Sequence, residues 1–566
     1  MRSPDVGSHY KSGTERRQSA GGVVRRCGRF AQPFGPAYSR ESEERSGRLM
    51  VRWADATDRV AWGARRRRCL IAGAGTFVVL FSVLMSRAVG QPSWNFLPDD
   101  TIALMAALGH HDEYGALLGK AYRPVVARAG DLHALMREPD PLGPWETIRS
   151  LALGDMHPPA FFLLLRGWIW AFGPEYGAVA ALNVLLVSLA VGVLAGVLTW
   201  YCGWWGLLVS TAVGLSPGAW TSAFEIRPNA LAAVATMVAL AGALPVLAGR
   251  SRLGWRHFVV VVVGSVLGLY AHYMTSLAVA TVFVSLWIGS WVRRDWETAK
   301  RAFGAAVVSG LLILPLVWML SVQKTPIRKS ADERSPATLE GVVQGVAGTV
   351  GCIGLNFMTL PKQTPAFGPV VAGGVLFLGG LGLLVMGRRW PVVAAGLVAF
   401  GLLCVVPGVL TMMRLMPRHS LQPKYYFCFA MVFASLGALG LAASASRGPR
   451  VVLGVVFVPL IVLSGWLQLT YRKPAYVSAN AQADPALLGG ADVVLIGSDL
   501  RGHVLPIVAN VKASAIVVMG GQEPLEGWIA QGGLKRLPGR QGYRCRIGGP
   551  SEAFTMPLYR EAGQDN

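Results

Sequence analysis

The chain has 566 residues, of which 53% are hydrophobic and 15% are charged, and its mean hydropathy is +0.44. A soluble domain carries about 25% charged residues, so the composition excludes an ordinary soluble protein and indicates a polytopic α-helical membrane protein. The net charge of +22 does not indicate a nucleic-acid partner, because Lys and Arg cluster in the N-terminal segment and in short segments between apolar runs. That distribution is the one the positive-inside rule describes.

The N-terminal segment, residues 1–68, is rich in Arg, Ser and Gly and shows no apolar period. We expect it to be a disordered, basic, cytoplasmic tail. It lacks the short apolar core and small-residue cleavage site of a secretory signal peptide, and Met50 is an alternative start of translation. Four arginines, Arg65 to Arg68, directly precede the first apolar span near 69–88 and predict that the N-terminus lies in the cytoplasm.

A long outer loop, residues 91–156, follows the first span. Apolar residues follow Asp100 at helical spacing, and Asp99 or Asp100 would cap the helix that they predict. Further apolar residues at 132–136 and 148–151 predict amphipathic helices lying in the membrane interface. Such a loop would roof a cavity that suits a substrate with one lipid end and one hydrated end.

Short basic clusters orient the later spans. If the clusters near 250–256, 293–301, 388–389 and 447–450 lie inside, the outer segments are 322–366, 412–423 and the tail from 471. From residue 228 onward, the expected spans are 228–248, 257–271, 273–292, 302–321, 368–387, 390–411, 424–443 and 450–470.

The same orientation places the candidate functional residues Asp99, Asp100, Asp155, Glu225 and Arg227 on the outer face. Four apolar segments lie between 157 and 248, yet an odd number must cross, so one segment near 157–173 or 204–222 should be re-entrant or interfacial. The expected number of full spans is about 11, with 12 or 13 as alternatives.

The C-terminal tail, residues 471–566, is expected to form a small extracytoplasmic α/β domain. Residues 491–496 and 515–519 read as buried strands, and 500–512 reads as a helix between them. The expected organisation is therefore a tail at 1–68, a transmembrane domain at 69–470 and this domain at 471–566.

Short polar motifs recur in a fixed order along the chain. An apolar span is followed by Asp99-Asp100, and after the outer loop His157 and two prolines enter the next helix. Glu225 and Arg227 then stand in a Ser-x-x-Glu-x-Arg-Pro motif before a span, and a His-Tyr pair heads another span. The order and sidedness of these motifs resemble the GT-C superfamily of membrane glycosyltransferases. They are most similar to family 39, the dolichyl-phosphate-mannose-protein mannosyltransferase-like group that includes bacterial lipid A aminoarabinose transferases.

This resemblance covers residues 69 to 470 and implies roles for the acidic pair and the arginine. Asp99 would be the catalytic base, with Asp100 assisting it or exchanging roles with it, although the second position is usually Glu in the family. Family members use a lipid-phosphate-linked sugar as donor and invert the anomeric centre. Arg227 matches the family's Arg-Pro position and would bind the donor phosphate through its guanidinium fork.

The resemblance also marks a set of substrate-binding residues. Lys424 stands where the family more often has Arg, which leaves Arg418 and Lys424 as alternatives for a second phosphate contact. Asp155 and His157 would orient the acceptor or complete a metal or base network. The further substrate-binding residues are Glu225, His272, Tyr273 and Tyr425.

Each of these residues also has a purely structural interpretation. Asp99 and Asp100 would be helix caps, His157 would end the loop before its prolines, and His272 would be an interfacial histidine. Glu225 and Arg227 would form an ion pair, and Arg418 and Lys424 would bind lipid headgroups. The segment from His110 to Glu113 reads as solvated loop, because adjacent residues seldom face one ion.

We therefore expect a multi-pass glycosyltransferase of the cell inner (plasma) membrane. It would transfer a sugar from a polyprenyl-phosphate donor to an unknown envelope acceptor, which is a lipid, a glycan or a protein. Membrane lipids are the other expected partners, no cofactor is implied with certainty, and dependence on a divalent metal is left open. The alternatives are a lipid-linked oligosaccharide transporter or flippase, and a surface-polysaccharide polymerase or ligase.

Overall fold

The structure is a computed structural model of the chain. It describes residues 36–89, 98–110, 125–137, 143–154, 157–322, 352 and 423–443, isolated residues between 458 and 466, and, in the tail, 493–497, 508, 511–520, 535–536, 543–546, 553–556 and 558–560.

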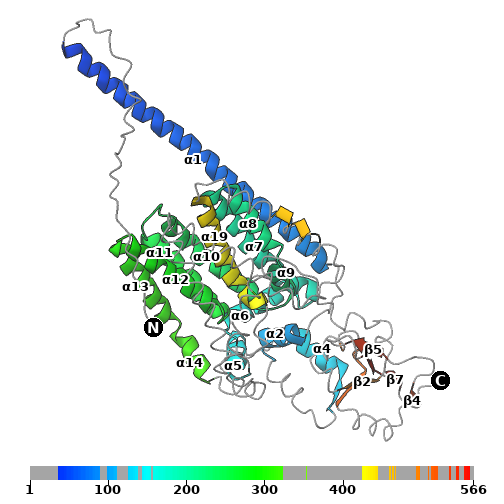
Figure 1. Ribbon diagram of the computed structural model, residues 1–566. Coiled ribbons are helices and arrows are strands. Elements are labelled where there is room, and N and C mark those ends of the chain that lie inside the picture. Colours follow the sequence, from blue (N-terminus) through cyan, green and yellow to red (C-terminus); the bar gives the residue numbers. More distant parts are fainter. Residues whose placement is uncertain are drawn as a thin grey trace, which may run out of the picture. The chain divides into compact units, whose positions relative to one another are not determined.

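The described part of the chain is mostly helical (Figure 1). Its first helices are α1 (Pro36–Val89), α2 (Pro98–Leu108), α4 (Ala129–Arg137), α5 (Pro144–Gly154), α6 (Ala160–Phe172), α7 (Tyr176–Cys202), α8 (Trp204–Gly214) and α9 (Pro217–Phe224). They are followed by α10 (Asn229–Leu247), α11 (Trp255–Ala271), α12 (Thr275–Val292), α13 (Trp296–Leu312), α14 (Leu314–Val322), the 3-10 helix η2 (Pro423–Tyr426) and α19 (Phe427–Ala443).

Four described helices are long and apolar enough to cross a membrane. They are the part of α1 from Gly63 onward, α7, α10 and α12; α13 and α14 together make a fifth candidate, bent by 44° where they meet. A polytopic membrane protein is the consequence. The larger number of about 11 to 13 spans stays a prediction, because the expected spans at 368–387 and 390–411 and most of 450–470 lie outside the described residues.

Helix α1 differs from the expected disorder through residue 68. The helix begins at Pro36, and the four arginines before the first span lie within it and are exposed. Arg, Ala and Glu are good helix formers, and a helix extends at little cost once an apolar span has formed its first turns. Amino-acid composition alone does not predict this extension of the helix from the span.

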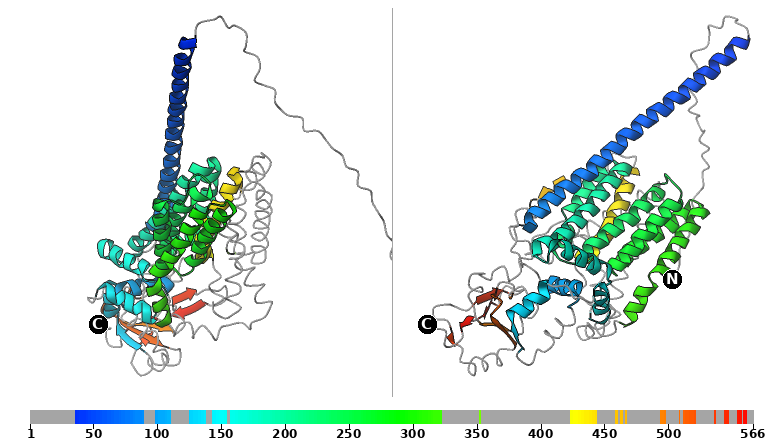
Figure 2. Two further views of the ribbon diagram at one scale, coloured as in Figure 1. Left: turned by 90° about the vertical axis from the view of Figure 1, so that its left-hand side faces the viewer. Right: turned by 180° about the vertical axis from the view of Figure 1, so that it is seen from behind.

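Helix α10 packs against α7, α11, α12 and α19 (Figures 1 and 2). Its sequence is rich in alanine, so neighbouring backbones approach closely. A Cβ atom placed on Gly264 of α11 would lie 2.3 Å from the backbone N of Ala239 and 2.7 Å from the carbonyl O of Ala235. Small residues at such crossings provide the van der Waals contact that holds membrane helices together.

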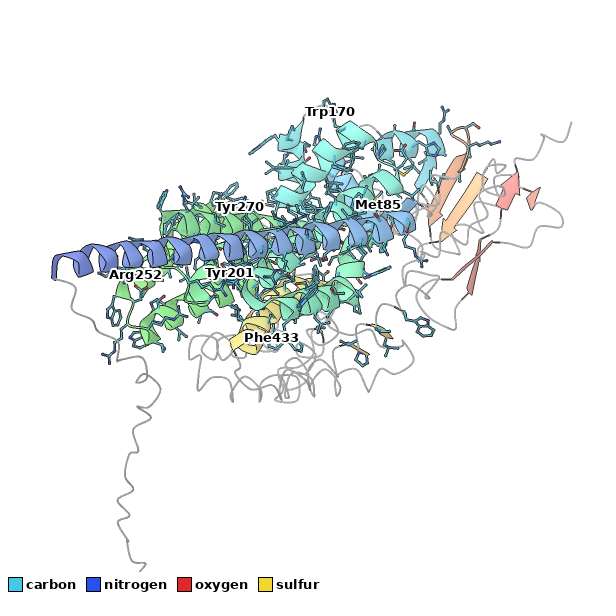
Figure 3. The ribbon with its side chains drawn as sticks, turned by 90° about the horizontal axis from the view of Figure 1, so that it is seen from above. Met85, Trp170, Tyr201, Arg252, Tyr270 and Phe433 are labelled. Carbon is cyan, nitrogen blue, oxygen red and sulfur yellow. The ribbon has the colours of Figure 1, made fainter. Side chains whose placement is uncertain are left out.

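Helix α6 is our candidate for the predicted interfacial segment. Its 13 residues span only about 20 Å, which is less than a hydrocarbon core of about 30 Å. By contrast, α8 packs back along α7 after the turn at Gly203, and α9 ends where the Tyr176 hydroxyl donates to the carbonyl of Phe224 at 3.0 Å. Together α8 and α9 thus return along the length of α7, which favours 157–173 as the interfacial segment. In agreement, Trp170 of α6 is 85% exposed and projects outward (Figure 3).

Seven short strands are described in the outer loop and the tail. They are β1 (Val125–Arg128), β2 (Val493–Gly497), β3 (Ile516–Gly520), β4 (Lys535–Arg536), β5 (Tyr543–Arg546), β6 (Ala553–Met556) and β7 (Leu558–Arg560). The first sheet has the order β1-β3-β2-β7-β4, and β5 pairs with β6.

The two central strands, β2 and β3, are parallel and correspond to the strands predicted at 491–496 and 515–519. Of the helix predicted at 500–512, Val508, Val511 and Lys512 are described. A separate α/β domain over 471–566 therefore stays a prediction. Strand β1 was not expected: it joins the outer loop to the tail by pairing antiparallel with β3, with Arg128 opposite Ile516.

The close crossing of α10 and α11 yields a stability prediction. Gly264→Ala should destabilise the protein by roughly 1–3 kcal/mol, because the added methyl group meets backbone that cannot move aside. Thermal unfolding in detergent micelles measures the change. Gly310→Ala on α13 is the matched control, since no atom lies within 4 Å of its Cβ position; equal melting temperatures for the two variants would contradict the crossing.

Candidate active site

Five segments bring polar side chains to one end of the bundle. They are the start of α2, the residues before α6, the junction of α9 and α10, the junction of α11 and α12, and η2. Their contacts, described below, connect them into one largely buried cluster, which we call the polar cluster. It contains Asp100, His157, Glu225, Arg227, His272, Lys424 and Tyr425.

The junction of α9 and α10 is a short non-helical strip inside the bundle. Ser216 caps α9 by accepting the N–H of Ala219 at 3.2 Å, with Pro217 in the first turn. The helix ends at Glu225, whose backbone is extended. Pro228 immediately precedes α10. The helical conformation is disfavoured for the residue before a proline, which here is Arg227. Glu225 and Arg227 are therefore presented from unwound backbone, and both are buried.

Unwound backbone inside a membrane protein needs hydrogen-bond partners, and Asn183 of α7 supplies them. Its amide Nδ2 lies 2.5 Å from the carbonyl O of Glu225 and 3.4 Å from those of Ser222 and Arg227. Sequence reasoning missed Asn183. The sequence signal that could have identified it is a single amide side chain in a 27-residue apolar helix. Polar side chains are costly within membrane spans, so those present usually bind a partner.

Asp100 supplies the matching acceptor. Its Oδ1 accepts the backbone N–H of Ile226 at 2.8 Å, and the residue is only 1% exposed. The bond joins residues 126 positions apart, so Asp100 does more than cap its own helix. Helix α2 is also buried around nearly its whole circumference, which differs from the interfacial, amphipathic helix that the apolar spacing suggested.

Arg166 of α6 holds the other end of α2. Its Nη1 donates to the carbonyl of Leu108 at 3.1 Å and to Oγ1 of Thr147 at 3.3 Å. The carbonyls at a helix C-terminus lack partners within the helix, and a cation there is favourable. Asp100 and Arg166 thus attach both ends of α2 to the bundle.

Glu225 and Lys424 form a buried ion pair. The Lys424 Nζ donates to Glu225 Oε2 at 2.5 Å, and the side chains are 6% and 4% exposed. The pair joins residues 199 positions apart and places η2 against α9. Lys424 is therefore engaged with a protein carboxylate, whereas the resemblance offered it as a phosphate contact.

Three rings extend the polar cluster away from this pair. The Lys424 Nζ lies 5.3 Å from the ring centroid of Tyr425, whose ring is 5.5 Å from that of His272. The rings of His272 and His157 are 5.8 Å apart. Nδ1 of His272 accepts the N–H of Met274 at 3.0 Å, which leaves Nε2 as the position for the ring proton. Tyr273 is adjacent and half-buried.

The remaining predicted site residues are described less fully. Asp99 lies in the first turn of α2 by its backbone, whereas its side chain, Asp155 and Arg418 lie outside the described residues. Of the acidic pair, it is thus the carboxylate of Asp100 that the structure connects to the Glu-x-Arg strip.

Among the described residues, no three His, Cys, Asp or Glu side chains are grouped so as to hold a metal ion. Of the segment from His110 to Glu113, only His110 is described. Dependence on a divalent metal therefore stays an open alternative, as in the sequence analysis.

The sequence matches no protein-family model, and no curated protein matches it. The resemblance to membrane glycosyltransferases is therefore carried by the short motifs alone.

The buried ion pair yields a stability prediction with a characteristic non-additivity. Glu225→Gln or Lys424→Met alone should cost roughly 3–5 kcal/mol, because each leaves one buried charge without its partner. The double variant should cost less than either single change. Unfolding of the purified protein in detergent, analysed as a double-mutant cycle, measures the coupling.

The matched control is the pair of Glu146 and Arg149 on α5, 3.5 Å apart, in which Arg149 is 57% and Glu146 is 13% exposed. Its removal should change stability by no more than about 1 kcal/mol. Additive costs for the Glu225 and Lys424 changes would show that the two charges are not coupled.

Proposed function

We propose that this protein is a membrane glycosyltransferase that takes a sugar from a polyprenyl-phosphate carrier and passes it to a hydroxyl group of an envelope acceptor. The observation that supports this most is the hydrogen bond from Ile226 to Asp100. It brings the acidic first turn of α2 to the strip that carries Glu225 and Arg227. An acid–base group and a phosphate-binding cation then belong to the same end of the bundle.

The chemistry needs a base on one side of the sugar. The acceptor oxygen attacks the anomeric carbon, and its proton passes to a carboxylate while the bond from that carbon to the phosphate oxygen breaks. Asp99 is our candidate for the base. Asp100 is the positioning residue, because one of its oxygens is already committed to the Ile226 N–H.

The leaving group needs a cation. Polyprenyl phosphate departs with the electron pair of the broken bond, and a positioned guanidinium stabilises the charge that develops on its oxygens. Arg227 is our candidate, since its planar fork matches phosphate geometry and its backbone is held by Asn183. The neighbouring ion pair of Glu225 and Lys424 would support the strip without adding net charge.

A transporter or flippase is the second candidate. Transporters place their binding groups near the membrane midplane, at broken helices related by internal repeats. Here the charged groups of the polar cluster gather at one end of the bundle. In the described part of the chain, apolar helices are interrupted at the bend between α13 and α14, at the break between α8 and α9, and at the unwound strip between α9 and α10. The arrangement thus favours an enzyme over a transporter, and it does not distinguish a transferase from a polysaccharide polymerase.

The deciding experiment measures release of radiolabelled sugar from a panel of polyprenyl-phosphate sugars by the purified protein. Asp99→Asn should lower turnover of the accepted donor by about 100-fold or more, because a general base contributes about 10²–10⁴-fold. Arg227→Lys should weaken donor use, since the charge remains but the fork is lost. Asp131→Asn on α4 changes an exposed carboxylate and should leave turnover unchanged.

Asp100→Asn separates base from positioning residue, because asparagine keeps an oxygen that accepts the Ile226 N–H. A small loss for Asp100→Asn and a large one for Asp99→Asn fits the proposal, and the reverse order would exchange their roles. A folded protein that turns over no donor, yet moves the same lipids across proteoliposome membranes, would establish the transport alternative instead.

A further inference from the structure

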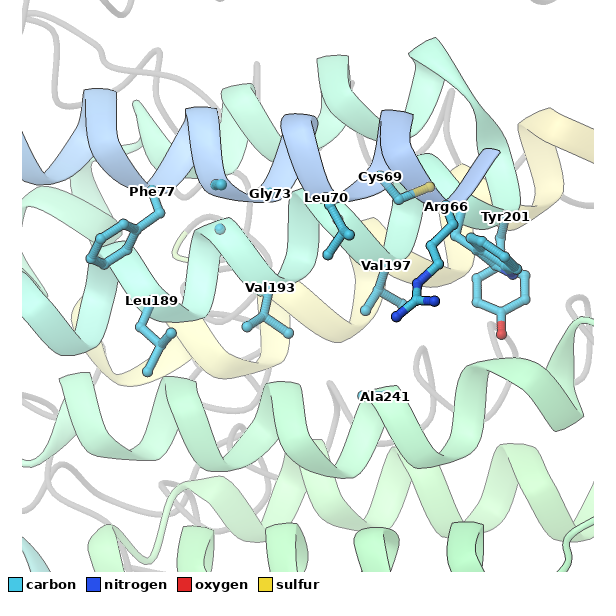
Figure 4. A pocket seen from close by; sticks show the side chains of 14 residues that line it. Arg66, Cys69, Leu70, Gly73, Phe77, Leu189, Val193, Val197, Tyr201 and Ala241 are labelled. Atoms are coloured by element: carbon cyan, nitrogen blue, oxygen red, sulfur yellow. The ribbon is translucent and has the colours of Figure 1, made fainter. Parts of the chain in front are cut away.

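A groove of about 610 Å³ lies along α1 and α7, away from the polar cluster (Figure 4). Side chains of α1 and α7 form its walls, and Ala241 of α10 contributes to its lining. Nearly all of the lining is apolar. The exceptions lie at one end, where Arg66 and Tyr201 both line the groove.

Glycines account for the shape of this groove. A Cβ atom on Gly73 would lie 3.0 Å from the carbonyl O of Gly192, and one on Gly192 would lie 2.9 Å from the Cβ of Phe77. Small residues let the two backbones approach, whereas Phe77 and Val193 are larger and stand beside this close contact. The result is a narrow floor between apolar walls, which suits a linear hydrocarbon chain.

The length of the groove corresponds to one leaflet of a bilayer. Its lining on α7 extends from Leu189 to Tyr201, which is about 18 Å along the helix axis. Half of a hydrocarbon core measures about 15 Å. A chain that enters at the Tyr201 end would therefore end close to the middle of the membrane.

Positive charge gathers where the groove opens. The guanidinium of Arg66 lies beside Tyr201 (Figure 4), and Arg250 stacks over the same ring at 4.9 Å from its centroid. Arg252 lies toward this end as well, whereas Met85 lies toward the other (Figure 3). The positive-inside distribution predicts that this end is cytoplasmic.

This end is also the one opposite the polar cluster. Asn183, which binds the Glu225 strip, and Tyr201, which closes the groove, lie 18 residues apart on α7, or about 27 Å. A molecule bound in the groove would therefore have its polar end at the membrane surface opposite the polar cluster, apart from the proposed transfer reaction.

We infer that this groove binds an anionic phospholipid of the cytoplasmic leaflet, with one acyl chain along α7 and the phosphate between Arg66 and Arg250. The arginine fork favours phosphate oxygens. Basic residues near a membrane surface each strengthen binding of anionic lipid by about fivefold. A zwitterionic lipid carries its own ammonium group and gains little from the same arginines.

Native mass spectrometry of the full chain, titrated with phosphatidylglycerol or with phosphatidylcholine of the same acyl chains, tests this site. Phosphatidylglycerol should occupy the protein at lower concentration. The double variant of Arg66→Gln and Arg250→Gln should weaken that binding by about 25-fold. The matched control, Arg67→Gln with Arg256→Gln, removes two exposed arginines that do not line the groove, and should change binding little.

A second pair of variants tests the acyl-chain track. Val193→Trp should fill the groove and abolish the tightest lipid adduct, whereas Val259→Trp places the same side chain on a comparably exposed position of α11 and should not. Equal binding of both lipids, equal losses for the two arginine pairs, or an unaffected adduct in Val193→Trp would each overturn the inference. These measurements do not depend on sugar transfer, so their outcome neither supports nor contradicts the proposed function.

Discussion

The whole polar cluster depends on a short stretch of buried backbone that is not helical. Between α9 and α10 the chain is unwound, and Glu225, Ile226 and Arg227 in this stretch are buried. Leaving the backbone N–H and C=O groups of such a stretch unpaired in a membrane protein costs several kcal/mol each. Asn183 binds the carbonyls, and Asp100 accepts the Ile226 N–H. Because these bonds come from two other helices, they fix where the strip carrying Glu225 and Arg227 lies.

Charge balance is the second constraint. A buried ion is tolerated only beside an opposite charge and suitable hydrogen bonds, and Glu225 meets this requirement by pairing with Lys424, nearly 200 residues later in the chain. The pair attaches η2 and the start of α19 to α9. The opposite end of α7 is also charged, but there Arg66 and Arg250 lie beside Tyr201. Charged side chains therefore lie toward both ends of α7, with Glu225 and Lys424 at one end and Arg66 and Arg250 at the other.

Much of the helical structure followed from apolar patterns, since α7, α10 and α12 coincide with long apolar runs. The gathering of Asp100, Glu225 and Lys424 at one end of the bundle agrees with their expected placement on a single side, while the outer face stays a prediction. The extent of α1 did not follow from composition, because helix propagation from a span is a cooperative effect. Strand β1 escaped prediction because four residues acquire strand structure only by pairing with β3, which lies far away in sequence.

By itself, the sequence determined that this is a helical membrane protein, where several spans lie, and which short polar motifs interrupt them. These are local properties, set by the transfer of apolar side chains into hydrocarbon and by the geometry of proline. Tertiary structure alone decided that Asn183 supports the unwound strip and that Glu225 pairs with Lys424. Each of these depends on which distant group lies close enough to satisfy a buried polar atom, and no local pattern encodes that distance.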